Sequence, residues 1–283
     1  MSTLLELKDI CLTYQTLKSE TEAIKNISFC VDNGDFISIV GPSGCGKTTI
    51  LSMISGLIKP TCGSIFLDGE PITKISTNVG YMLQRDNLFE WLTLYQNIMI
   101  GPSINHKKNC LSKEKLNELL SKYGLAGFEK SKPNELSGGM RQRVSLIRTL
   151  ALNPKLLLLD EPFSALDYQT RIAVQNDMHS IIKSEHKTAI LVTHDISEAV
   201  VMSDKVIILT KRPGTVKKIL KIDFDKSLSP LERRNSLKFN EYFKTLWEEL
   251  QWKGLLYLTK KILVPQNIKN ISKKNEQKLF WFT

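Results

Sequence analysis

The stretch GPSGCGKTT at residues 41–49 decides how this chain folds. It fits the pattern G-x-x-x-x-G-K-[ST]. An apolar run, FISIV at 36–40, precedes it, and residues 50–57 continue with apolar side chains at helical spacing. This strand–loop–helix context favours a phosphate-binding loop over the alternative, a glycine-rich turn that holds no ligand.

A loop of this kind binds phosphate mainly with its backbone. Glycines let the chain turn tightly, so that several amide N–H groups and the N-terminus of the next helix point at the anion. We expect Lys47 to reach the β- and γ-phosphates of a nucleotide and to assist catalysis, and Thr48 to hold Mg²⁺. The candidate nucleotide-binding residues here are Gly41, Pro42, Ser43, Gly44, Cys45, Gly46, Lys47, Thr48 and Thr49.

The composition is that of a globular protein. Hydrophobic residues make up 42% of the 283 residues, and no uninterrupted apolar stretch reaches the length of a membrane-spanning helix. The first residues, MSTLLELKDI, lack the basic and apolar regions of a secretory signal. We therefore expect the chain to stay in the cytosol.

The five cysteines do not form a C-x-x-C pair, which argues against a zinc site or a disulfide framework. In a cytosolic chain we expect free thiols. Cys45 lies inside the phosphate loop, and the neighbouring amides and Lys47 suggest a lowered thiol pKa.

The net charge of +10 is uneven along the chain. Residues 251–283 hold seven lysines and one acidic residue, Glu276, a net charge of +6. Such a tail can contact nucleic acid or an anionic membrane surface. A disordered end without a role is the default expectation.

Strand and helix patterns alternate along most of the chain, which predicts an α/β fold with a mainly parallel sheet. Short antiparallel strands are expected in the first forty residues. Residues 86–136 read as helical, without a convincing strand. A capping box at 229–232 begins a helix that we expect to continue to about Leu250. The buried strands are predicted at 64–67, 79–83, 156–159, 188–192 and 206–209.

A second motif follows the apolar strand at 156–159, which ends in Asp160 and Glu161. Ligands bind at the carboxyl ends of parallel strands in such folds. Asp160 would bind Mg²⁺, and Glu161 would act as general base toward the attacking water. The alternative is a solvated acidic turn without a ligand, and the presence of a phosphate loop in the same chain argues against it.

The third motif is LSGGMRQR at 136–143, at the start of a helical pattern. With it, residues 5–220 resemble the ATP-binding-cassette (ABC) ATPases, the motor subunits of ABC transporters. The resemblance implies a P-loop NTPase core with a mainly parallel sheet, an antiparallel β subdomain and an inserted α-helical subdomain. It also implies ATP and Mg²⁺ as ligands.

Residue by residue, the resemblance assigns further roles. Gln84 matches the glutamine that contacts Mg²⁺ and the catalytic centre, and His194 matches the histidine that holds the water and Glu161 in place. Tyr14 matches the aromatic that stacks on adenine, although it could simply be a strand aromatic. The residues expected to bind the nucleotide of a second ATPase subunit, or to lie beside it, are Ser137, Gly138, Gly139 and Asp167.

The expected domain organisation has three parts. An ABC ATPase domain covers residues 1–220, with the helical subdomain inserted at about 86–150. A helical extension follows at 221–252, and the basic tail at 253–283 departs from the pattern by which this resemblance is recognised.

Two further segments resemble the nitrate/sulfonate/taurine-type importer ATPases, NLFEWLT at 87–93 and KRPG at 211–214. That resemblance implies a peripheral protein on the cytoplasmic side of the membrane. Its partners would be a second ATPase subunit, a membrane permease and, indirectly, a solute-binding protein, with no nucleic acid. Leu88, Phe89 and Trp91 would be exposed as a socket for a permease helix, or would pack inside the helical subdomain. The rival interpretation is a soluble ABC ATPase that acts on nucleic acid or ribosomes.

Overall fold

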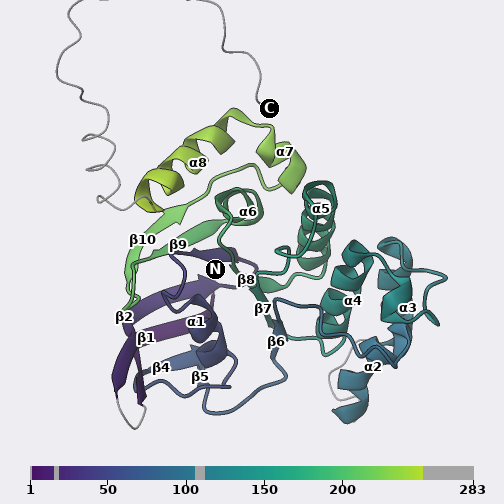
Figure 1. The fold of residues 1–283 in the computed structure, drawn as a ribbon, viewed down its shortest axis with the longest axis horizontal. Coiled ribbons are helices and arrows are strands. Elements are labelled where there is room, and N and C mark those ends of the chain that lie inside the picture. Colours follow the sequence, from purple (N-terminus) through teal and green to yellow (C-terminus); the bar gives the residue numbers. More distant parts are fainter. Residues whose placement is uncertain (1, 16–18, 106–111, 251–283) are drawn as a thin grey trace, which may run out of the picture.

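Two β-sheets organise the computed structural model, which describes residues 2–15, 19–105 and 112–250 (Figure 1). The larger sheet has the strand order β10-β9-β3-β8-β7-β6, and the smaller sheet has the order β2-β1-β4-β5. The strands are β1 (Thr3–Gln15), β2 (Glu20–Asp32), β3 (Phe36–Val40), β4 (Cys62–Leu67), β5 (Glu70–Pro71), β6 (Val79–Met82), β7 (Leu156–Asp160), β8 (Thr188–Val192), β9 (Lys205–Leu209) and β10 (Val216–Lys221).

The larger sheet is parallel except for β10, which runs antiparallel to β9 at the edge. Every residue of β3, β7 and β8 is buried. Such continuous apolar strands form because helices or a second sheet cover both faces. The predicted buried strands at 79–83, 156–159, 188–192 and 206–209 are confirmed in this sheet, whereas the one at 64–67 belongs to β4 of the antiparallel smaller sheet and is only partly buried. Strand β10 was not predicted, because its lysine-rich sequence, VKKILK, lacks a buried pattern.

Alternate residues of β3 point into different cores. Ile37 and Ile39 pack with α1 (Lys47–Ile54) and the smaller sheet, so that α1 lies between the two sheets (Figure 1). Phe36 lies in the opposite core, which is built with helices α4 (Gly138–Leu150) and α5 (Tyr168–Ser184). The phosphate loop therefore connects a strand that is held on both faces to a buried helix.

The smaller sheet differs from the prediction of short strands, because β1 and β2 are each 13 residues long. Register shifts along the β1–β2 pair let this long ribbon bend, and they interrupt the alternation that a sequence pattern needs. In the β1–β4 pair, Cys11 lies opposite Cys62. The two form a disulfide with a Cα–Cα distance of 5.0 Å, so the expectation of free thiols is wrong for this pair. The two cysteines are 51 residues apart in the sequence, so their contact could not be predicted without the register of β1 and β4.

Helices form a separate lobe beside β6 and β7 (Figure 1). Between residues 86 and 136, the described part of the chain contains helices and turns but no strand, as predicted. The helices are α2 (Leu94–Ile104), α3 (Lys113–Lys122) and the short 3₁₀ helix η1 (Pro133–Glu135). The apolar side chains of α3, Leu116, Leu119 and Leu120, are buried in the core that α3 shares with α4.

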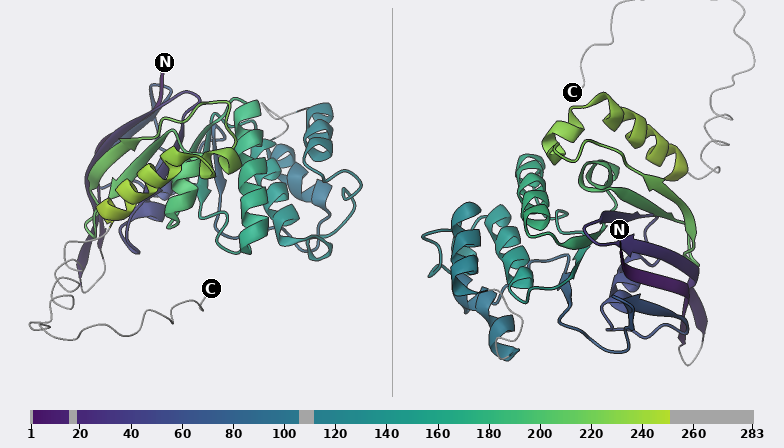
Figure 2. Two further views of the ribbon diagram at one scale, coloured as in Figure 1. Left: turned by 90° about the horizontal axis from the view of Figure 1, so that it is seen from above. Right: turned by 180° about the vertical axis from the view of Figure 1, so that it is seen from behind.

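The C-terminal segment forms two helices, α7 (Pro230–Arg234) and α8 (Leu237–Leu250), instead of the one predicted. The capping box at Ser229 is present as expected. The Ser236 hydroxyl donates a 2.8 Å hydrogen bond to the Arg233 carbonyl, which ends α7 before α8 begins. Figure 2 shows the yellow-green helix α8 packed across α6 (Ile196–Met202) near the β10 edge, where Leu246 is buried. The predicted basic tail lies outside the described residues.

Within the ranges that the structure describes, no helix is both long enough and apolar enough to cross a membrane.

Candidate nucleotide-binding site

A polar pocket of about 220 Å³ opens at the N-terminus of α1. Its walls come from β2, the phosphate loop, the turn after β7 and the turn between β9 and β10. The lining residues are Ala23, Ser43, Gly44, Gly46, Lys47, Thr48, Thr49, Glu161 and Arg212. All of these except Ala23 and Arg212 belong to the predicted site, whereas the predicted Gly41, Pro42 and Cys45 do not line the pocket.

The phosphate loop has the geometry that its glycines allow. Gly46 has φ of +99° and Gly44 has φ of +73°, in the left-handed region that favours glycine. A Cβ atom on Gly46 would also lie 2.3 Å from the Ile24 side chain. Lys47 is only 9% exposed, and its Nζ donates to the carbonyl oxygens of Gly41 at 2.9 Å and Pro42 at 3.2 Å. The loop thus brings a cation and several amides to one small volume.

The Cys45 thiol does not behave as the sequence suggested. It is fully buried, and burial raises the pKa of this thiol more than Lys47 and the neighbouring backbone amides lower it. The hypothesis of a lowered pKa is therefore wrong. Burial was not visible from the loop sequence, in which only the favourable charge and amides can be read.

The first pair of predicted residues that the fold unites is Thr48 and Asp160. The Thr48 hydroxyl donates to Asp160 Oδ1 at 3.2 Å, and the Tyr81 hydroxyl donates to Asp160 Oδ2 at 3.3 Å. Burial raises the pKa of Asp160. A hydroxyl and a carboxylate oxygen are donors that suit Mg²⁺, which is usually held by one or two carboxylates together with substrate phosphates and water. This fits the donor set here, because the described residues contain no cluster of three or more His, Cys, Asp or Glu side chains that could hold a metal by themselves.

The second group consists of Glu161, His194 and Gln84. His194 Nδ1 lies 3.1 Å from Glu161 Oε2, and Gln84 Nε2 lies 3.5 Å from the same oxygen. Glu161 has a left-handed backbone with φ of +46°, and its amide donates to the Val192 carbonyl at 2.9 Å. This turn directs the carboxylate into the pocket from the end of β7. Three strand ends, after β6, β7 and β8, therefore deliver the three side chains to one point.

Tyr14 lies at the rim of this region. Its side chain is 42% exposed, and its hydroxyl lies 3.4 Å from Thr49 Oγ1. This exposed position beside the phosphate loop suits a stacking platform for a base.

The predicted signature residues lie elsewhere. Ser137 caps α4 by accepting a hydrogen bond from the Met140 amide at 3.3 Å, and Asp167 caps α5 by accepting one from Thr170 at 3.1 Å. A Cβ on Gly139 would lie 2.9 Å from the Thr170 side chain, and one on Gly138 would lie 3.3 Å from Leu166. These residues therefore pack beside one another, and none of them lines the pocket of this chain.

Comparisons with known proteins identify the family of this chain. The sequence profile of the family described as ABC transporter matches residues 24–164. An uncharacterized ABC transporter ATP-binding protein, YtlC of Bacillus subtilis, is 46% identical over 239 residues, which are 84% of this chain and 92% of YtlC. The chain belongs to the ABC transporter ATP-binding family. It is therefore an ATPase cassette.

This ABC cassette is also similar to a named import protein and to a solved cassette structure. The aliphatic sulfonates import ATP-binding protein SsuB of Bacillus cereus is 40% identical over 237 residues, which are 83% of this chain and 91% of SsuB. The dimeric structure of a post-hydrolysis state of the cassette MJ0796, bound to ADP and Pi, matches with a TM-score of 0.66 and 33% identity, covering 78% of this chain and all of that one.

The ABC cassette also brings residues to the site that the sequence did not reveal. Tyr81 contacts Asp160, Ser164 Oγ lies 3.5 Å from Gln84 Nε2, and Arg212 lines the pocket. The available signals were the position of Tyr81 in a strand next to Gln84 and the KRPG segment around Arg212. Neither signal shows that the side chain of Tyr81 or Arg212 points toward the site.

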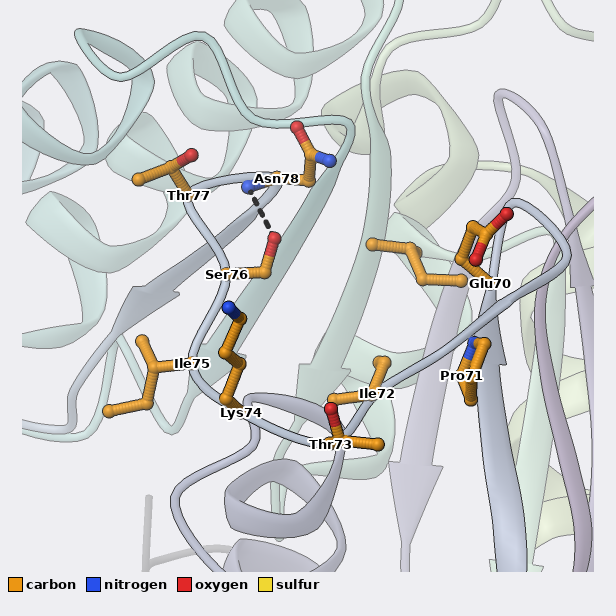
Figure 3. A pocket seen from close by; sticks show the side chains of 10 residues that line it. Glu70, Pro71, Ile72, Thr73, Lys74, Ile75, Ser76, Thr77 and Asn78 are labelled. Carbon is orange, nitrogen blue, oxygen red and sulfur yellow. Dashed lines mark hydrogen bonds between the residues drawn. The ribbon is translucent and has the colours of Figure 1, made fainter.

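A larger hollow of about 380 Å³ in the ABC cassette contains none of the predicted residues. Figure 3 shows its wall, the segment from Glu70 to Asn78. In this wall the backbone amide of Asn78 donates a hydrogen bond to Ser76 Oγ at 3.2 Å.

Proposed function

We propose that this cassette is the ATP-hydrolysing subunit of an import system that moves a small solute, such as a sulfonate, nitrate or a related small compound, through a membrane permease. The single observation that carries the ATPase part is the 3.1 Å contact between Glu161 and His194 at the mouth of the phosphate pocket. The similarity to SsuB, which is named as a sulfonate import protein, supports the solute class.

Nucleotide binding uses the pocket as it stands. The phosphates lie against the loop amides and the N-terminus of α1, and Lys47 exchanges its two carbonyl partners for phosphate oxygens. Tyr14 stacks on the adenine. Thr48, Asp160 and Gln84 are the residues that would hold Mg²⁺, which when bound neutralises charge on the phosphate oxygens.

Catalysis is centred on Glu161. Its carboxylate accepts a proton from the attacking water, while the contact with His194 fixes its orientation. Gln84 approaches the same carboxylate oxygen at 3.5 Å and helps to position the water. Because Glu161 leaves β7 in a left-handed turn, its backbone directs the carboxylate toward the γ-phosphate side of the loop.

The signature residues act on a second cassette. Ser137, Gly138 and Gly139 begin α4 outside this chain's own pocket, where the helix N-terminus and the Ser137 hydroxyl suit a γ-phosphate held by a partner. Asp167 lies beside them at the start of α5. The MJ0796 cassette is dimeric in its post-hydrolysis structure with ADP and Pi, which supports an arrangement of two ATP molecules between two cassettes.

The permease contact is proposed at Phe89 and Trp91. Their rings lie 5.1 Å apart, and Trp91 is 71% exposed. Leu88, for which the sequence left open either the socket or packing inside the helical subdomain, is buried at 7% exposure in the core with α2 and α4. The socket interpretation is thus wrong for Leu88 and the alternative of internal packing fits it, because the turn after β6 directs that side chain inward. The cassette lies on the cytoplasmic side of the membrane in this proposal, with residues 221–250 as a helical extension of the ATPase domain.

The test is affinity capture of the full chain from detergent-solubilised native membranes, with the partners identified by mass spectrometry. Recovery of a multi-span permease together with ATPase activity supports the proposal. Recovery of ribosomes or nucleic acid without a membrane protein would overturn the import function and leave the ATPase standing. A capture with the Phe89→Ala/Trp91→Ala variant serves as the matched control, because it should lose the permease and keep nucleotide binding.

A further inference from the structure

The turn between β9 and β10 is hydrogen-bonded to strand β2 through Gly214, and it packs there against the phosphate loop. The Gly214 amide donates to the Ala23 carbonyl at 2.9 Å, and its own carbonyl accepts from the Lys25 amide at 3.0 Å. A Cβ atom on Gly214 would lie 2.2 Å from the Cys45 carbonyl oxygen, which is closer than any side chain permits. The turn therefore contacts the backbone of the loop directly.

The same turn is also closed on itself. The Thr210 amide donates to the Thr215 carbonyl at 3.0 Å, and the Thr215 amide donates to the Thr210 hydroxyl at 2.9 Å. These bonds hold the backbone of Arg212 at the tip of the turn, beside the loop. The position of this arginine is thus prepared before any ligand arrives.

The guanidinium of Arg212 faces the phosphate pocket. Its Nε donates to the Gly44 carbonyl at 3.3 Å, and the side chain lines the pocket together with Lys47 and Glu161. Among the described residues, no acidic side chain forms an ion pair with Arg212, and its terminal amino groups make no hydrogen bond. A guanidinium has five N–H donors in a planar fork, so most of its capacity is available to a ligand.

Arg212 and Lys47 share one feature. Each is a cation in the pocket whose hydrogen bonds go to neutral carbonyl oxygens of the phosphate loop. A phosphate group is a stronger partner for such a cation, because the bond is then assisted by both charges. A polyphosphate that enters the pocket therefore meets two cations that can exchange a weak partner for a strong one.

We propose that Arg212 is a second cationic ligand of the polyphosphate, acting beside Lys47 on nucleoside di- and triphosphates bound to its own cassette. This inference rests on the proposed nucleotide site. Because the turn is already in place, little ordering of the backbone opposes the contact. A charge-assisted hydrogen bond at a partly solvated position should change the affinity by about tenfold.

The experiment measures the affinity of the full chain for ATP and for inorganic tripolyphosphate by calorimetry. We expect Arg212→Gln to bind both ligands about tenfold more weakly than the unmodified protein does. Arg212→Lys keeps the charge without the fork and should recover part of the loss for both ligands. Lys211→Gln is the matched control, because it removes the adjacent positive charge from a residue that does not line the pocket, and it should bind both ligands nearly as the parent does.

Three results would overturn the proposal. Equal affinities of Arg212→Gln and the parent for both ligands would show that the guanidinium does not reach phosphate. A loss for ATP alone would assign it to the base or ribose. A loss of equal size in Lys211→Gln would show a general effect of charge. Thermal unfolding without ligand shows whether Arg212→Gln has simply lost its fold. In that case the affinities of Arg212→Lys for ATP and tripolyphosphate provide the test. Failure of the parent itself to bind ATP would instead refute the proposed function.

Discussion

The hydroxyl of Thr193, the residue immediately before His194, donates a 2.5 Å hydrogen bond to Glu198 Oε2. The other carboxylate oxygen of Glu198 accepts a 3.2 Å bond from Gln175, whose own oxygen accepts a 3.3 Å bond from Arg234. Glu198 is only 4% exposed. A largely buried polar path thus connects helix α7 to the turn that holds the catalytic histidine of the proposed mechanism.

Glu198 gives this path a pH dependence. Burial, followed by the nearby Asp195, raises the pKa of Glu198 to about 7, although Thr193, Arg171 and His194 act in the opposite direction. This pKa lies above the ordinary value of 4.5. Between pH 4.5 and about pH 7, Glu198 is therefore protonated in the folded protein and deprotonated in the unfolded chain. The stabilisation from this group is therefore complete below about pH 4.5 and is lost as the pH rises through about 7.

We predict that Glu198→Gln, which does not titrate, gains stability relative to the parent between pH 5 and pH 8. Urea unfolding of both proteins across this range measures the difference in the free energy of unfolding. Glu248→Gln, at an exposed position of α8, is the control and should show no such trend. Parallel pH profiles of Glu198→Gln and the parent would contradict the prediction.

Glu161→Gln should bind ATP and lose hydrolysis. The amide keeps the shape of the side chain near His194 but cannot accept the proton of the attacking water, so the rate should fall by about a hundredfold or more. Nucleotide affinity and phosphate release are measured on the same preparation. Hydrolysis at the rate of the parent would remove Glu161 from the role of general base.

Lys47→Ala should weaken ATP binding itself, in contrast to Glu161→Gln. The Lys47 amine lies among the loop carbonyls, where it is ready to contact phosphate, and a lost charge-assisted contact costs about 1.5–3 kcal/mol. Calorimetric titration with ATP measures the loss, and circular dichroism checks that the variant keeps the overall secondary structure of the parent. Undiminished affinity would reject the phosphate role of this lysine.

Phe89→Ala combined with Trp91→Ala should leave ATP binding intact and uncouple transport, because Trp91 is exposed and neither ring lines the pocket. Solute uptake and ATP hydrolysis by the reconstituted complex are compared. Leu88→Ala is the contrasting variant, since removing this buried side chain should destabilise the helical lobe by about 2–5 kcal/mol. Uptake at the parent rate by the double variant would refute the contact.

Much of the site could be predicted from contiguous residues. The phosphate loop, the acids at the end of β7 and the histidine after β8 are each local patterns that follow a buried strand. Parallel strands place their carboxyl ends at one edge of a sheet, so the meeting of Glu161 and His194 follows once these strands are identified. The Ser229 cap was equally readable, because the capping residues are three positions apart.

Local spacing and periodicity were enough to predict the nucleotide loop and the chemical identity of the candidate catalytic groups, and the resemblance to the ABC ATPases supplied the subdomains of the fold. Only the tertiary structure decided that Cys11 meets Cys62, that Cys45 is buried with a raised thiol pKa, that Leu88 turns inward while Trp91 stays exposed, and that Arg212 reaches the Gly44 carbonyl. Each of these depends on burial or on contact between segments far apart in the chain, and neither is encoded in the spacing of neighbouring residues.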